Sequence, residues 1–140
     1  MAHADGGSGA RPRPTSPHLQ IYSPQINMVM SIVHRITGAA LYFGSLLLAI
    51  WLIAAAMGPE AFDMVNALFG SIIGRLVLFG YTWALLHHML GGIRHLIWDT
   101  GRGLDIKSAD LLCWVSIIAS VLLTIVIWLG ATGVLAGGAS

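Results

Sequence analysis

Three long apolar segments constrain the fold of this chain more than any other feature. They lie at about 28–57, 69–98 and 109–136, and each exceeds the roughly 20 residues that a helix needs to cross a bilayer core. Only 9% of the 140 residues are charged, whereas soluble domains carry about a quarter. The sequence therefore predicts an all-α membrane protein with three transmembrane helices in one domain, residues 28–136, which leaves no room for a soluble catalytic domain.

The distribution of Lys and Arg predicts the orientation of these helices. Cationic residues gather before the first segment, at its start, and around the second connection: Arg11, Arg13, Arg35, Arg94, Arg102 and Lys107. The first connection, 58–68, has neither Lys nor Arg. Because cytoplasmic loops are enriched in these residues, we expect residues 1–27 and the second connection to be cytoplasmic. Single arginines do not make a basic patch, so we expect no nucleic-acid partner.

The third segment carries the signature of a packing helix. Ser116, Ser120 and Thr124 recur at every fourth position, and small hydroxylated residues on one ridge let helices approach closely in lipid. Ser108 precedes the apolar run and is the predicted N-cap. Cys113 is the single cysteine, cannot form an internal disulfide, and is predicted to be a buried structural thiol.

The second segment carries the strongest indication of function. At about 100° per residue, His88, Gly92, His95 and Asp99 fall on one stripe of the helix. Ionisable groups at membrane depth are costly, so each is a candidate for a functional site. His88 lies near the expected midplane, where coordination of iron by a neutral imidazole would account for it, and glycines one turn later leave room for a flat ring. We therefore predict a haem-binding helix with His88 as an axial ligand.

The neighbouring histidines have other interpretations. His95 lies closer to the cytoplasmic surface and is expected, with Arg94, near the haem propionates. Since His88 is the only histidine at midplane depth on the stripe, the second axial ligand is expected from another subunit. His87 points about 100° away from the stripe. A packing role, with hydrogen bonds but no metal, remains open for either His87 or His88.

A second polar stripe marks the first segment. Its members share one helical face: Asn27, Ser31, His34, Arg35, Gly38 and Tyr42. Beyond Ser45 this helix is apolar, so the polar face covers only the cytoplasmic half of the membrane. A pocket of that depth suits a quinone, which is soluble in lipid but needs protons and hydrogen bonds at its oxygens. Ser31 could donate a hydrogen bond, and Arg35 could stabilise negative charge, although Arg35 alone could also be a plain interfacial anchor. His34 could contact a propionate or carry protons.

Two strings now point to a family. SPHLQIYSPQINMVMSIVHRITG at 16–38 and HMLGGIRHLIWD at 88–99 closely resemble the cytochrome b membrane-anchor subunits of succinate dehydrogenase, respiratory complex II. The similarity extends from about Arg11 to Trp128 and includes the three-helix layout. The motifs S-x-x-H-R-x-[ST]-G and H-x-x-x-G-x-R-H-x-x-x-D are long and specific when they occur together.

The resemblance implies a haem b shared with a second small three-helix anchor that supplies the other axial histidine. It also implies a heteromeric helix bundle in lipid, with an iron–sulfur subunit and a flavoprotein on its cytoplasmic face. The family's membrane is the bacterial or the mitochondrial inner membrane, and we expect the bacterial one because the sequence shows no Arg- and Ser-rich amphipathic transit segment of useful length. Electrons would pass from succinate to ubiquinone, and the dehydrogenase active site would lie outside this chain.

Family residues carry over by motif position. His88 matches the haem ligand, Ser31 and Arg35 match quinone-site residues, and His34 and His95 match positions near the propionates. The doubled histidine at 87–88 leaves the ligand open to a shift of one residue.

Two other functions compete with this interpretation. One is a haem-free structural anchor, in which the histidines satisfy one another or line a packing seam. The other is a small transporter or proton-conducting subunit. The apolar outer halves of the first and third segments count against conduction.

Overall fold

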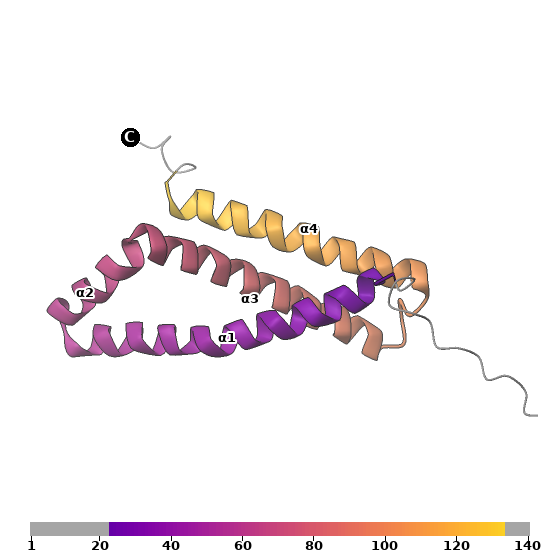
Figure 1. The fold of residues 1–140 in the computed structure, drawn as a ribbon, viewed down its shortest axis with the longest axis horizontal. Helices are drawn as coiled ribbons and strands as arrows, with labels where there is room; N and C mark the ends of the chain where they lie inside the picture. The colour runs from indigo at the N-terminus through magenta and orange to yellow at the C-terminus, as the bar shows by residue number, and fades with distance from the viewer. Residues whose placement is uncertain (1–22, 134–140) are drawn as a thin grey trace, which may run out of the picture.

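In the part of the chain that the structure describes, three long helices run beside one another, and a short helix joins two of them (Figure 1). The computed structural model describes residues 23–133, which form helices and no strand. The helices are α1 (Ile26–Met57), α2 (Pro59–Gly70), α3 (Ile72–Asp99) and α4 (Ile106–Ala131). Since α1, α3 and α4 are long and apolar enough to cross a membrane, the prediction of three transmembrane helices is confirmed.

The bundle has two distinct ends. At the end that we call the loop end, residues 100–105 join α3 to α4, and α1 begins there (Figure 1). At the other end, the α2 end, α2 crosses obliquely from α1 to α3. Helix α3 lies between α1 and α4, whereas α1 reaches α4 near the loop end, where Asn27 bonds to Asp110. Most of the predicted N-terminal segment 1–27 lies outside the described residues, as do positions 134–136 of the third predicted helix.

The first connection differs from its prediction, because most of it is helical. Gly58 ends α1 with a φ of 117°, a backbone conformation that glycine adopts without strain, and Pro59 opens α2 in the position where a missing N–H costs nothing. Apolar side chains of α2, among them Phe62 and Phe69, are partly buried in the bundle. Helix α3 then starts at a separate cap, since the Ser71 hydroxyl accepts a hydrogen bond from the backbone N–H of Gly74.

The cap of α4 is three residues earlier than predicted. Asp105 is the N-cap, and its carboxylate accepts a hydrogen bond of 2.9 Å from the backbone N–H of Ser108. The prediction of Ser108 as the cap is therefore wrong, because this serine lies in the first turn of the helix. Two hydrogen bonds from Ser108 lower the pKa of Asp105, and the one from the backbone N–H has a larger effect than the one from the side chain.

The helices approach where side chains are small. Ser116, Ser120 and Thr124 of α4 are buried, which confirms the predicted packing ridge, and each hydroxyl bonds to a carbonyl of its own helix. Cys113 is fully buried, as predicted. By contrast, most large apolar side chains are exposed, the pattern expected of helices whose outer faces meet lipid or other helices.

Candidate functional site

The polar stripes of α1 and α3 meet in a cluster of three histidines. The rings of His34 and His88 stack with centroids 4.0 Å apart and an interplanar angle of 4°. The ring of His95 lies 5.4 Å from His34 at an angle of 57°. Two segments that are more than 50 residues apart in sequence are therefore brought together at the residues that the sequence singled out.

The hydrogen bonds of His88 select one tautomer. Its Nδ1 atom lies 3.1 Å from the carbonyl oxygen of His34 and 3.4 Å from the hydroxyl of Thr37. A carbonyl oxygen can only accept, so Nδ1 carries the proton and Nε2 keeps its lone pair. Within residues 23–133, no hydrogen bond engages Nε2. This is the state in which an imidazole binds a metal, with its other nitrogen fixed by an acceptor.

Thr37 strengthens this arrangement. It is 2% exposed, and its hydroxyl lies 3.0 Å from the carbonyl oxygens of both Val33 and His34, to which it donates. Its oxygen is then free to accept from the Nδ1–H group of His88. The sequence analysis gave this threonine no role, although it lies in the same motif as His34.

Glycines allow the two rings to lie this close to the helices. A Cβ atom at Gly38 would come within 2.9 Å of Cε1 of His88, and one at Gly91 would overlap Nδ1 of His34. Nothing lies within 4 Å of a Cβ added at Gly92. The two adjacent glycines of α3 therefore differ: the first makes room for a histidine of this chain, and the second faces open space.

His87 occupies a closed environment. It is 1% exposed, its Nδ1 atom lies 3.3 Å from the hydroxyl of Ser120 on α4, and its ring stacks on Trp83 at 5.1 Å. Its Nε2 atom is buried and has no partner among the described residues. His87 thus packs between α3 and α4, whereas His88 is only partly buried beside α1.

The two residues predicted to bind quinone do not line the same pocket. Ser31 and Arg35 are both exposed on α1. Ser31 lines a pocket of about 320 Å³ at the loop end, whereas Arg35 does not. The lining residues of this pocket, which we call the Ser31 pocket, come from α1, α3, the loop and α4: Asn27, Ser31, Arg94, His95, Trp98, Leu104 and Ala109.

A chain of polar contacts borders the Ser31 pocket. Arg94 is 3% exposed, and its Nη1 atom donates to Sγ of Cys113 at 3.3 Å. The thiol donates to Oδ1 of Asn27 at 2.9 Å, and Nδ2 of Asn27 donates to Asp110 at 2.6 Å. Sequence reasoning considered Arg94 only beside His95 and did not connect these residues. The sequence did contain one indication that these residues meet, because all of them lie near the same end of the three apolar segments.

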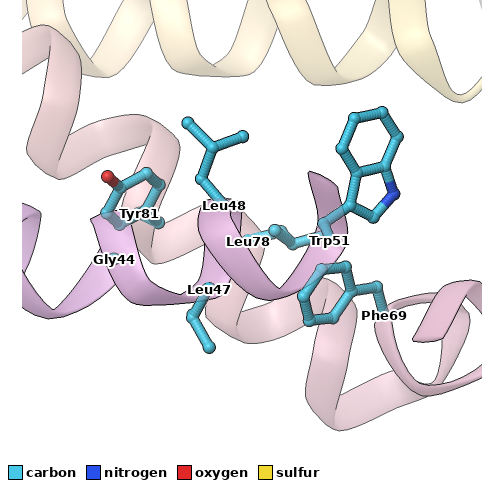
Figure 2. Close-up of a pocket in the computed structure, with 7 residues that line it drawn as sticks. All are labelled: Gly44, Leu47, Leu48, Trp51, Phe69, Leu78 and Tyr81. Atoms are coloured by element: carbon cyan, nitrogen blue, oxygen red, sulfur yellow. The ribbon is translucent and has the colours of Figure 1, made fainter. Parts of the chain in front are cut away.

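Apolar cavities lie along the interface between α1 and α3, which we call the α1–α3 seam, between the histidine cluster and the α2 end. One of about 280 Å³ is shown in Figure 2, where Tyr81 packs beside Gly44 and aromatic side chains of α1 and α2 close the other side. A neighbouring cavity of about 360 Å³ shares Gly44 and Tyr81 and reaches Gly80 and Ala84. Because Ala84 lies one turn from His88, this seam offers room for the apolar edge of a flat group beside that ring.

Comparison with known proteins gives a consistent result. The family described as "Succinate dehydrogenase/Fumarate reductase transmembrane subunit" matches residues 9–127. The succinate dehydrogenase cytochrome b556 subunit of Rickettsia prowazekii is 42% identical over 116 residues, which are 83% of this chain and 90% of that protein. The subunit of the same name from Paracoccus denitrificans is 42% identical over 113 residues, covering 81% and 87%. The mitochondrial cytochrome b560 subunit of Sus scrofa is 40% identical over 99 residues, covering 67% and 57%.

Proposed function

This chain belongs to the succinate dehydrogenase/fumarate reductase transmembrane subunit family, and we propose that it provides one axial ligand of haem b and part of a ubiquinone site. It is a multi-pass inner-membrane anchor subunit, whose family implies a complex with iron–sulfur and flavoprotein subunits. Within that complex, the proposal assigns electron transfer and quinone binding to this chain, while the oxidation of succinate takes place in the flavoprotein.

The observation that carries the haem proposal is the state of His88. Its Nδ1–H group is held by the carbonyl oxygen of His34, and its Nε2 lone pair has no partner in the described residues. The space beside it fits a flat ring, since Gly92 is open and the seam continues past Ala84 and Gly80. Haem b, when bound, supplies a centre that takes up and returns one electron. His88 would ligate its iron, with His34, Arg35 and His95 near the propionates.

The surroundings of His88 also support the participation of a second chain. Among the described residues, His88 combines an Nδ1–H group held by a carbonyl oxygen with an unbonded Nε2 atom, and His87 is enclosed against α4. We propose that a second three-helix anchor subunit supplies the opposite ligand, which would cover apolar surface now exposed on the helices. A shared haem would thereby hold two membrane subunits together.

The quinone proposal concerns the loop end. Cationic residues on and around the 100–105 loop favour the cytoplasm for this end, where the soluble subunits would dock. The hydroxyl of Ser31 is exposed there and would donate to a quinone oxygen. Arg35, exposed one turn along α1, would attract the negative charge that develops on reduction.

The test compares two adjacent histidines in the assembled complex. We expect wild type to show the Soret and α absorbance bands of a b-type haem. His88→Ala should lose most of this haem, and His87→Ala should keep it, because the Nε2 atom of His87 is enclosed between α3 and α4 whereas His88 is only partly buried. Thermal unfolding of both variants controls for misassembly. A complex without haem bands would support the rival function, a haem-free anchor, and loss of haem in His87→Ala alone would move the ligand by one residue.

A further inference from the structure

Arg94 is a buried cation without a counter-ion in the described residues. A guanidinium has five N–H donors and stays charged at physiological pH. Here one of its nitrogens donates to a thiol at 3.3 Å, the Nε atom has no partner within residues 23–133, and no carboxylate pairs with it there. Burial of a cation is unfavourable unless acceptors compensate for the lost water. The position of Arg94 therefore calls for an oxygen-bearing group that comes from outside these residues.

The guanidinium is held in place by its surroundings. Cys113 is a weak acceptor, and it is itself fixed by its hydrogen bond to Asn27, which bonds to Asp110. On another side, the guanidinium carbon lies 5.2 Å from the centre of the Trp98 ring, within range of a cation–π interaction. Direct contacts with α3 and α4, with Asn27 of α1 behind Cys113, thus fix the position of one cation.

The Ser31 pocket is where an oxygen-bearing group could reach this cation. Arg94 and Ser31 line it together, and none of its seven lining residues is a carboxylate. Trp98 adds an aromatic surface to the same lining. Its volume of about 320 Å³ lies within the range of small-molecule sites. A ring with carbonyl oxygens would meet a hydroxyl, a guanidinium and an indole there.

Arg94 and the proposed haem ligand His88 point in different directions around the axis of α3. Arg94 follows His88 by six residues, which places it about 120° away around α3. It lies within roughly 20° of His87, and both side chains are buried on the side of α3 that meets α4. The side chains of Arg94 and of the proposed ligand His88 therefore leave α3 on different faces. This argues for a ligand other than haem at Arg94.

We infer that Arg94 is a second cation of the quinone site, in addition to Arg35, and that it binds the oxygen on which negative charge develops while Ser31 donates a hydrogen bond in the same pocket. This inference rests on the proposed function. Reduction of a quinone to a quinol takes two electrons, supplied by the reduced iron–sulfur subunit, and two protons from water, and each C=O becomes a C–OH group. Arg94 keeps its own protons and stabilises the charge before protonation.

The inference also assigns a positioning role to Cys113. It touches Arg94 but does not line the pocket. Cys113→Ala should raise the KM for quinone more than it lowers kcat, because the guanidinium would lose its anchor and not its charge. Cys113→Ser, which restores a donor and an acceptor, should recover most of the affinity.

The decisive experiment uses the purified complex with decylubiquinone as acceptor. Arg94→Gln should lower kcat/KM for quinone by roughly 100-fold, and Arg94→Lys by less, because it keeps the charge. Succinate oxidation by a soluble artificial acceptor and the haem spectrum should match wild type. Arg75→Gln is the matched control, because Arg75 is exposed near the other end of the same helix. A complex with this substitution should reduce quinone at the wild-type rate.

Each other outcome has a distinct meaning. A wild-type complex that oxidises succinate but cannot reduce quinone would contradict the proposed function itself. Normal quinone reduction in Arg94→Gln, or haem loss in that variant, would overturn this inference alone. If Arg94→Gln fails to assemble, a photoreactive azidoquinone bound to wild type decides: labelling of residues 27–31 and 94–104 is expected, and labelling elsewhere would overturn the assignment.

Discussion

Replacement of Gly38 by alanine tests the geometry of the proposed haem ligand most directly. The new Cβ atom would lie 2.9 Å from Cε1 of His88, whereas ordinary contact begins at 3.4 Å, so the ring must withdraw by roughly 0.5 Å. Because the acceptor of its Nδ1–H group, the His34 carbonyl, belongs to α1, the same movement weakens the 3.1 Å hydrogen bond. We expect His88 to lose both its position and part of its fixed tautomer.

The expected magnitude follows from these two effects. Overpacking that a side chain can relieve costs about 1 kcal/mol, and a weakened hydrogen bond adds up to about 1 kcal/mol. Together they should reduce haem affinity by about 5- to 30-fold. Alanine is otherwise the better residue in a helix, by roughly 0.5–1 kcal/mol, so α1 itself should not be destabilised. Loss of haem without loss of the helix is therefore the distinguishing result.

The assay measures haem bound per complex by reduced-minus-oxidised absorbance during dilution, together with thermal unfolding. Gly130→Ala is the matched control, because a Cβ atom there meets nothing within 4 Å and lies on α4. Gly92→Ala adds a second comparison. No atom of residues 23–133 lies within 4 Å of the new Cβ atom, so loss of haem in this variant would indicate a clash with the haem ring itself. If Gly38→Ala retains haem as tightly as Gly130→Ala, the argument for His88 as the ligand fails.

Three further predictions concern the packing that supports the site. Ser120→Ala should destabilise the complex by about 1 kcal/mol, because Nδ1 of His87 would lose its interhelical partner. Gly44→Ala should lower the melting temperature, since the new Cβ atom would overlap the ring of Tyr81. The pKa of Asp105 is depressed in the folded state, so its contribution to stability is present above its ordinary value of 3.8 and is lost as pH falls through the folded value. Asp105→Asn should flatten the acid side of the stability profile.

Controls separate these predictions from general damage. Ser45→Ala removes an exposed hydroxyl that bonds only to its own helix, at Tyr42, and should leave stability unchanged. Gly130→Ala places a Cβ atom where nothing among the described residues lies within 4 Å, and it should not lower the melting temperature as Gly44→Ala does. An unchanged acid profile in Asp105→Asn would mean that the cap does not couple to global unfolding.

The protein's membrane architecture could be derived from sequence because it depends on properties that do not require knowledge of neighbours. Segment length and apolar composition decide whether a helix can span a bilayer, and all three spans are helical in the structure. The same holds for Ser116, Ser120 and Thr124, whose spacing of four residues puts them on one face of any α-helix. Periodicity also placed His34 and His88 on polar stripes before their contact was visible.

The ends of the helices were less predictable from sequence, because they depend on the geometry of the capping residues. The helix at 59–70 is short and amphipathic, and its apolar side chains become informative only when they meet the bundle. Asp105 and Ser108 are both good caps by residue type. The backbone path of the loop decides which side chain meets a free N–H group, and here it is Asp105.

Helical periodicity alone determined which residues share a face, so it identified the two stripes and placed His88 and Gly92 on one of them. Only the tertiary structure decided what each face meets. His87 and His88 are neighbours in sequence, yet one is enclosed by α4 and the other is held open beside α1. Likewise, Arg35 and Arg94 are both arginines near one end, but only Arg94 is buried beside Ser31. Rotation by 100° per residue turns adjacent side chains toward different partners, and partners come from distant parts of the chain.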